Sequence, residues 1–157
     1  MVKNNRVIAA TVIATGLAIP AEGIRQWAYQ DSKGVLSVCY GSTSEIDPNH
    51  QYTLAECRVR LDKDMAKAID IVEKCAPKLP EHQLAAFADA VYNLGPTVVC
   101  DTNKSTLAKK LKSGDIIGAC KELIKWNKIK VRDQAIPLPG LTKRRQREMD
   151  LCLRGLV

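Results

Sequence analysis

Apolar side chains recur every three or four residues between positions 54 and about 74 (Leu54, Cys57, Leu61, Met65, Ala68, Ile69 and Val72). This is the period of one face of an α-helix. Thr53 and Glu56 fit the capping box that begins a helix. We therefore predict a long amphipathic helix after Thr53, preceded by the polar loop "DPNHQYT" and ended by "APKLP".

Four later segments also have helical spacing. They are "EHQLAAFADAVYNLG" (81–95), "STLAKKLKSG" (105–114), "DIIGACKELIKWNKI" (115–129) and the basic "LTKRRQREMDLCLRGL" (141–156), the last preceded by a rigid loop, "IPLPG". Gly95 and Gly114 are typical residues at helix ends, and Ser105 and Asp115 are typical caps. Only residues 34–43 read as extended. The pattern predicts an α+β, mainly α, fold with one small β element near its start and no internal linker.

A run of fifteen uncharged residues, 7–21, follows Lys3 and Arg6. A cationic start and a short apolar stretch are typical of an export signal. A stable membrane span needs about 20 strongly apolar residues, and this run is interrupted by Gly16 and Pro20. An uncleaved export segment is favoured, because cleavage after "AIPA" would leave a flexible amine beside Glu22. An ordinary buried first helix is the alternative. We divide the chain into an apolar export or signal-anchor-like segment (1–21) and one domain (22–157).

The net charge of +7 fits three polyanionic partners, namely nucleic acid, anionic lipid or an acidic cell envelope, and equally a basic surface without a specific partner. The chain has no helix-turn-helix signature, zinc-finger spacing or basic stripe interleaved with aromatic residues. We therefore expect no nucleic-acid partner.

The six cysteines are scattered, without a CxxC pair, and neither His50 nor His82 lies at ligand spacing from them. A zinc site is therefore not expected. An even number of scattered cysteines after an apolar start favours disulfides in an oxidising compartment. Six buried thiols in a cytosolic protein are the alternative.

Two acids and a hydroxyl follow the apolar run closely. Glu22 abuts apolar residues, whereas Asp31 lies in the polar, turn-like "YQDSKG". A desolvated carboxyl can act as a general acid beside a second, ionised carboxylate, which is the arrangement that cleaves glycosidic bonds. Ser37 would hold the attacking water. The spacing alone is more typical of two solvated surface carboxylates than of a catalytic pair.

Residues 22–43, "EG-x5-Y-x-D-x2-G-V-x-S-V-C-x-G-x-T", resemble the active-site segment of phage-type lysozymes, in particular the endolysins of lambdoid-like phages. Further blocks resemble this family in the same order: "YTLAEC" (52–57), "FADAVYNLG" (87–95), "STLAKKLKSGDIIGAC" (105–120) and "PGLTKRRQREMDLCL" (139–153). The resemblance covers roughly residues 20 to 155.

This resemblance implies a muramidase without a cofactor that hydrolyses the β-1,4 bond between N-acetylmuramic acid and N-acetylglucosamine in peptidoglycan, with inversion. It implies two lobes, one with a small β-hairpin and one helical, joined by a long helix around a substrate cleft. By motif position Glu22 is the general acid, Asp31 the second carboxylate and Ser37 the water-positioning hydroxyl.

Two residues depart from the family pattern. Ser37 stands where threonine is usual, and Ser42 stands where histidine is frequent. Three other functions remain open: a lytic transglycosylase, a catalytically impaired peptidoglycan-binding protein on the same fold, and a basic, membrane-active helical protein.

The resemblance also implies the disulfides Cys39–Cys57, Cys75–Cys100 and Cys120–Cys152. It implies a monomer that is exported to the host periplasm, first tethered to the inner membrane by residues 7–21, and dependent on a holin only indirectly. The basic side chains of the last helix (Lys143, Arg144, Arg145 and Arg147) are expected to form a solvated face or to meet the anionic wall. One of these arginines could pair with Glu22.

Overall fold

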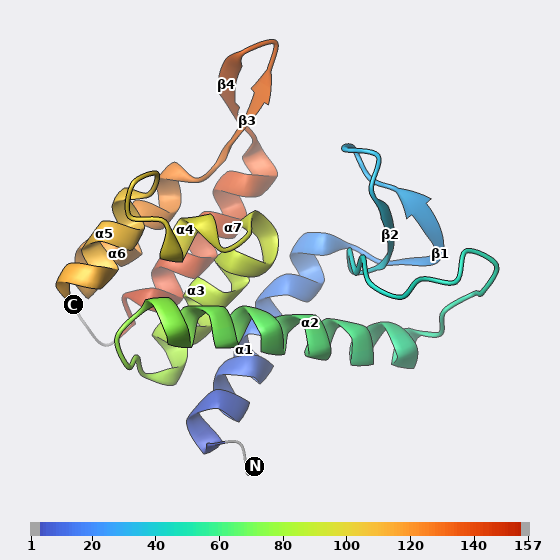
Figure 1. Ribbon diagram of the computed structural model, residues 1–157, viewed down its shortest axis with the longest axis horizontal. Helices are drawn as coiled ribbons and strands as arrows, with labels where there is room; N and C mark the ends of the chain where they lie inside the picture. Colours follow the sequence, from blue (N-terminus) through green and yellow to red (C-terminus); the bar gives the residue numbers. More distant parts are fainter. Residues whose placement is uncertain (1–3, 155–157) are drawn as a thin grey trace.

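The long helix α2 (Leu54–Cys75) runs from a small N-terminal lobe into a helical C-terminal lobe in this computed structural model, which describes residues 4–154 (Figure 1). The N-terminal lobe contains the antiparallel hairpin of β1 (Arg25–Gln30) and β2 (Leu36–Cys39). The other helices are α1 (Asn5–Glu22), α3 (Glu81–Leu94), α4 (Thr97–Cys100), α5 (Thr106–Ser113), α6 (Ile116–Glu122) and α7 (Pro139–Cys152). The α+β, mainly helical, fold class is confirmed.

The start of α2 follows the capping prediction. The Thr53 hydroxyl accepts a hydrogen bond from the Glu56 backbone N–H at 3.1 Å, and the Glu56 carboxylate accepts one from the Thr53 N–H at 2.6 Å. The apolar face is buried as expected except at Leu54, which is exposed in the first turn. The helix therefore packs against the core and positions both lobes.

Residues 7–21 lie inside the fold as most of helix α1. Small side chains at Ala10, Ala14 and Ala18 are fully buried in the core, and α1 contacts α2, α3 and α7. Arg6 fixes the start of α1 by donating to the Leu79 carbonyl at 2.6 Å and pairing with Glu73. Among the helices described here, none combines the length and the apolar character needed to cross a membrane.

The expectation that only residues 34–43 are extended is wrong. Residues 25–30 form β1, with Tyr29 opposite Ser37 in the register. The helix expected over 115–129 ends at Glu122, continues as one 3₁₀ turn (Leu123–Lys125), and is followed by a second hairpin, β3 (Lys128–Val131) and β4 (Gln134–Pro137). Lys and Ile or Val alternate with period two in β3, which favours a strand over a helix.

The residues in the turn of this second hairpin explain why the sequence did not predict it. Arg132 and Asp133 both adopt positive φ, 49° and 66°, a backbone region that usually signals itself through glycine or asparagine. Helix α7 also begins two residues earlier than expected, with Pro139 in its first turn, where a missing N–H costs little.

The three expected disulfides are confirmed. Cys39–Cys57 joins β2 to α2, Cys75–Cys100 joins the end of α2 to α4, and Cys120–Cys152 joins α6 to α7. All six cysteines are thus paired, which removes the alternative of buried free thiols. The first bridge fixes the β-hairpin to the long helix and so fixes one wall of the site.

Candidate active site

Glu22 is the last residue of α1, and Gly23 then turns the chain into β1 with a φ of 67°. A carboxylate at this position faces the negative end of the helix dipole. Arg144 offsets this by donating from Nη1 to Glu22 Oε1 at 2.5 Å. The Glu22 side chain is 22% exposed. The arginine partner that the sequence left open is therefore Arg144.

Arg144 is itself held inside the C-terminal lobe. Its Nε and Nη2 donate to the two carboxylate oxygens of Asp89 on α3, at 3.0 and 2.7 Å. Beside it, Arg145 Nη2 donates to Glu148 at 2.7 Å and to Asn93 at 2.9 Å. Arg144, Arg145, Asp89 and Glu148 are all buried. The expectation of a solvated basic face on this helix is wrong for Arg144 and Arg145, because they turn inward to pair with these carboxyl groups.

The charges of this buried cluster act on one another. Burial lowers the pKa of Arg144, but hydrogen bonding to Asp89 and the charges of Asp89 and Glu22 raise it by more. Burial raises the pKa of Glu148 well above its usual value, and Asp89 raises it further. Burial lowers the pKa of Arg145, although the charge of Glu148 opposes this shift. Arg144 therefore stays a cation beside Glu22.

Asp31 occupies the turn between β1 and β2. Its Oδ1 accepts backbone hydrogen bonds from Lys33 at 2.8 Å and Val35 at 2.9 Å. These bonds fix the orientation of the carboxylate. They leave Oδ2 without a hydrogen bond from the described residues, so that it is available to a substrate or water.

Ser37 lies on β2 and is only 2% exposed. Its hydroxyl donates to the Val35 carbonyl at 3.2 Å. Because that bond uses the hydroxyl proton, the lone pairs of the Ser37 oxygen remain available to accept a hydrogen bond from water.

One cleft of about 570 Å³ brings the three predicted residues together. Glu22 comes from the end of α1, while Asp31 and Ser37 come from the hairpin. The other residues that line the cleft are Tyr29, Ser32, Tyr40, Gly41, Thr43, Asp64, Lys67, Ala68, Ile71, Val91, Tyr92, Asn93 and Pro96.

Tyr92 and Asp64 are cleft residues that the sequence did not reveal. The Tyr92 hydroxyl donates to the Tyr40 carbonyl at 2.7 Å, which joins α3 to the N-terminal lobe. Burial, followed by the charges of Glu22 and Asp64, raises the pKa of Tyr92, so the hydroxyl keeps its proton.

Asp89 could have been noticed in the sequence as the only acid within an otherwise apolar stretch of its helix, "LAAFADAV". No comparable sequence signal marks Tyr92, because a tyrosine on a helix most often belongs to the core.

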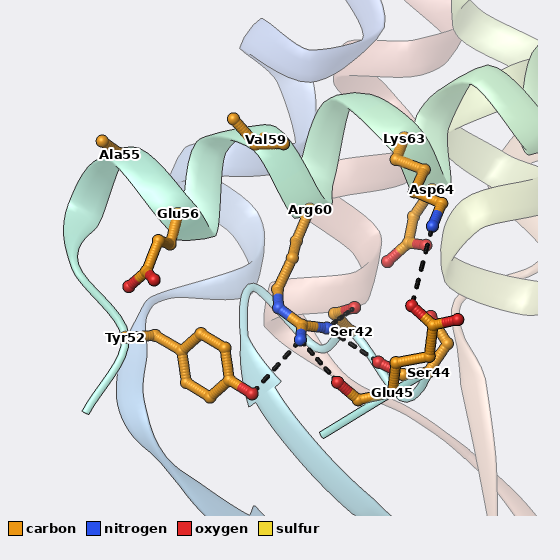
Figure 2. Close-up of a pocket in the computed structure, with 10 residues that line it drawn as sticks. All are labelled: Ser42, Ser44, Glu45, Tyr52, Ala55, Glu56, Val59, Arg60, Lys63 and Asp64. Atoms are coloured by element: carbon orange, nitrogen blue, oxygen red, sulfur yellow. Dashed lines mark hydrogen bonds and ion pairs between the residues drawn. The ribbon is translucent and has the colours of Figure 1, made fainter. Parts of the chain in front are cut away.

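A second pocket, of about 460 Å³, lies between α2 and residues 42–52 (Figure 2). Figure 2 shows Arg60 reaching from α2 to this segment, where it donates to the Ser44 and Glu45 carbonyls, both at 2.7 Å, and to the Tyr52 hydroxyl at 3.2 Å. Ser42, at the position where the family often has histidine, is buried and accepts a bond from Arg60 at 3.4 Å. Arg60 therefore fixes to α2 the segment that follows the cleft residues Gly41 and Thr43.

A helical lobe and a small β-hairpin lobe that enclose a cleft lined by carboxyl groups, Glu22 and Asp31 among them, are the architecture of a lysozyme-like glycoside hydrolase. The model of the family described as phage lysozyme matches residues 20–148. The chain is 35% identical to a "SAR-endolysin" of Bacteriophage PS119 over 98% of this chain and 90% of that protein. The chain belongs to the phage lysozyme family, and the expected enzyme class, a glycoside hydrolase of the lysozyme type that acts on peptidoglycan, is confirmed.

Solved structures show the same fold. The muramidase domain of SpmX from Asticcacaulis excentricus superposes with a TM-score of 0.80 at 21% identity, covering 96% of this chain and 99% of that one. The active form of the P1 phage endolysin Lyz gives 0.77 at 22% identity over 98% and 96% of the two chains. Its secreted inactive form gives only 0.57 at 18% identity over 98% and 97%. The fold described here is thus closer to the active form of that protein.

Proposed function

We propose that the chain is an endolysin that hydrolyses the β-1,4 bond between N-acetylmuramic acid and N-acetylglucosamine, with Glu22, Asp31 and Ser37 as its catalytic residues. The observation that supports this assignment is that all three side chains line one cleft while Arg144 holds Glu22 in place. The proposal includes inversion at the anomeric carbon, as the resemblance implies.

In this mechanism Glu22 donates its proton to the glycosidic oxygen as the bond to the anomeric carbon breaks. Asp31 stabilises the positive charge that develops on the sugar and directs a water to the opposite face of the ring. Ser37 accepts a hydrogen bond from that water. The water passes its other proton to the Asp31 carboxylate and becomes the new anomeric hydroxyl. Arg144, bonded to Glu22 Oε1, stabilises the carboxylate that Glu22 becomes after proton transfer.

Clearing of a cell-wall suspension by the wild type, Glu22→Gln and Ser37→Ala tests this assignment. We expect Glu22→Gln to abolish clearing and Ser37→Ala to reduce it. Equal clearing by wild type and Glu22→Gln would overturn the assignment and favour membrane-active lysis. Wild-type protein that binds peptidoglycan but never clears it would indicate an impaired, binding-only protein.

Mass spectrometry of the released muropeptides tests the remaining rival enzyme. A hydrolase leaves a reducing sugar with one added water, whereas a lytic transglycosylase leaves an anhydro-sugar. Asp31 lies in the cleft with Glu22, and this second carboxylate favours the hydrolase.

We also propose that the protein is exported to the host periplasm as a monomer and acts at the end of infection, with only an indirect dependence on a holin. Residues 1–21 would serve as an export and signal-anchor segment and residues 22–157 as the catalytic domain. A relative with 35% identity is called a SAR-endolysin, which supports this proposal.

In a tethered state Glu22 would lie at the membrane surface, away from Arg144. Insertion of α1 into the core, as in the structure, places the acid in the cleft. Fractionation of cells that express Glu22→Gln tests this: we expect a membrane-bound population that becomes soluble periplasmic protein when the membrane is depolarised. Protein found only in the cytosol would contradict it.

A further inference from the structure

The β3–β4 hairpin stands out from the C-terminal lobe, and the muramidase mechanism makes no use of it (Figure 1). All eight of its strand residues are exposed. A lone two-stranded hairpin is only marginally stable in water. This exposed hairpin is therefore a candidate surface for contact with a binding partner.

The strand register gives the hairpin two chemically different faces. Ile129 pairs with Ile136, and Val131 lies on the same face; these three side chains are 40%, 39% and 42% exposed. Lys128 and Lys130 lie on the opposite face, since side chains alternate along a strand. Arg132 is at the tip, in the turn. The hairpin therefore presents apolar side chains, three cations and one carboxylate, that of Asp133 in the turn, and keeps a net positive charge.

The base of the hairpin is next to the proposed acid. The Leu138 N–H donates to the Asn127 carbonyl at 2.9 Å and closes the base. Residues 138–141 then line a cavity of about 460 Å³ together with Ala21, Glu22, Asn93 and Arg144. Glu22 and Asn93 also line the proposed catalytic cleft, but Asp31 and Ser37 do not line this cavity at the base of the hairpin. A glycan strand that passes Glu22 away from Asp31 would reach residues 138–141, which directly follow the hairpin at its base.

The substrate offers the complementary chemistry. The peptide stems of peptidoglycan combine alanine methyl groups with free carboxylates, and they project from alternate sugars of the strand. We propose that the β3–β4 hairpin is a binding surface for these peptide stems, on the side of Glu22 away from Asp31. This inference rests on the proposed function, because it takes peptidoglycan in the cleft as its starting point.

Matched charge variants test the surface. The hairpin variant carries Lys128→Gln, Lys130→Gln and Arg132→Gln. The control carries Lys104→Gln, Lys109→Gln and Lys112→Gln, which removes the same three charges from exposed positions on and just before α5. Both are made in the Glu22→Gln background, so that binding is measured without cleavage, and thermal melting verifies that each variant is folded.

Binding is then measured by co-sedimentation with intact sacculi and by pull-down on immobilised glycan strands from which an amidase has removed the peptides. For intact sacculi at low salt we expect the Kd of the hairpin variant to rise about 3- to 150-fold, the effect of losing three exposed ion pairs. The Kd of the control should stay unchanged. On stripped glycan all three proteins should bind alike. A hairpin variant that binds intact sacculi like the control overturns the inference. An equal loss of binding to stripped glycan would also overturn it. The same variants are tested on anionic phospholipid vesicles, and a loss of binding seen only there would overturn the inference as well.

Failure of the proposed function would look different. If the protein with Glu22 intact releases no reducing ends from either substrate, the muramidase assignment fails, whereas the binding comparison can still be read. If that protein cleaves both substrates while the hairpin and control variants bind alike, only the peptide-stem surface is wrong.

Discussion

Arg144 Nη1 donates to Glu22 Oε1 at 2.5 Å, and the same guanidinium is held from behind by both oxygens of Asp89. Arg144 thus fixes the proposed acid against the interior of the C-terminal lobe. A lysine has no planar fork and cannot bond Glu22 and Asp89 in this geometry.

Arg144→Lys should therefore lower the initial rate of cell-wall clearing about 100-fold, the scale expected when a catalytic group is misplaced by about 1 Å. Arg147→Lys, at an exposed position on the same helix, is the matched control and should clear like the wild type. Equal rates for the two variants would show that Arg144 does not position Glu22.

Glu148 predicts a specific dependence of stability on pH. Its pKa is raised in the folded protein, chiefly by burial, so the folded state holds a proton that the unfolded state releases above the usual carboxyl range. The unfolding free energy therefore falls as the pH rises from about 4.5 towards the folded-state pKa. Glu148→Gln removes this titration, and its stability relative to wild type should increase by up to about 1.4 kcal/mol per pH unit in that window.

Urea unfolding at several pH values between about 2.5 and 8 measures this difference, because the window for Glu148 lies above the usual carboxyl pKa and that for the Glu122 control lies below it. Glu122→Gln is a control of opposite sign, because hydrogen bonding to Lys110 lowers the pKa of Glu122. The contribution of Glu122 is present above the usual carboxyl pKa and is lost as the pH falls, so Glu122→Gln should lose stability relative to wild type as the pH rises. If the unfolding free energy of both variants followed the same pH dependence as the wild type, the proposed pKa shifts of Glu148 and Glu122 would be wrong.

Gly41 lies in the cleft beside Glu22, where an added methyl group would fill space next to the carboxylate without a clash. Its φ is +92°, and a Cβ at this position would lie 4.0 Å from Glu22 Oε2. Gly41→Ala should lose about 1–2 kcal/mol of stability through the left-handed backbone and lose activity as well. Gly114→Ala has a similar φ of +84° and nothing near its Cβ, so it should lose comparable stability but no activity, as measured by thermal melting and clearing rate at a temperature where both are folded.

The Cys39–Cys57 disulfide ties the strand that carries Ser37 to α2. Replacing both cysteines with serine should cost about 2–4 kcal/mol of stability and reduce clearing even well below the melting temperature, because the hairpin wall of the cleft loosens. Replacement of Cys120 and Cys152, which join α6 to α7, should cost similar stability. We expect it to leave more activity at low temperature. Equal activity losses would argue against this role of the first bridge.

The sequence by itself determined the features that depend on near neighbours. Thr53 and Glu56 are three residues apart, so their capping box could be predicted from the sequence alone, and the structure contains it. Glu22, Asp31 and Ser37 fall within one short segment, and their common cleft followed from the resemblance of that segment together with the other blocks. The disulfide pairs were likewise implied by resemblance and are present.

Tertiary structure decided the rest. Arg144 and Glu22 are 122 residues apart. The sequence allowed a pair between Glu22 and an arginine of this helix, but which arginine it is depends on how α7 docks beside the end of α1. The same docking turns Arg144 and Arg145 inward, where residue type and helical period alone predicted solvent. The β3–β4 hairpin was also not predicted from the sequence, because its turn residues adopt positive φ without being glycine and its strands are short. Pairing between distant charges depends on which helices pack together, and that is a property of the whole core rather than of any local pattern.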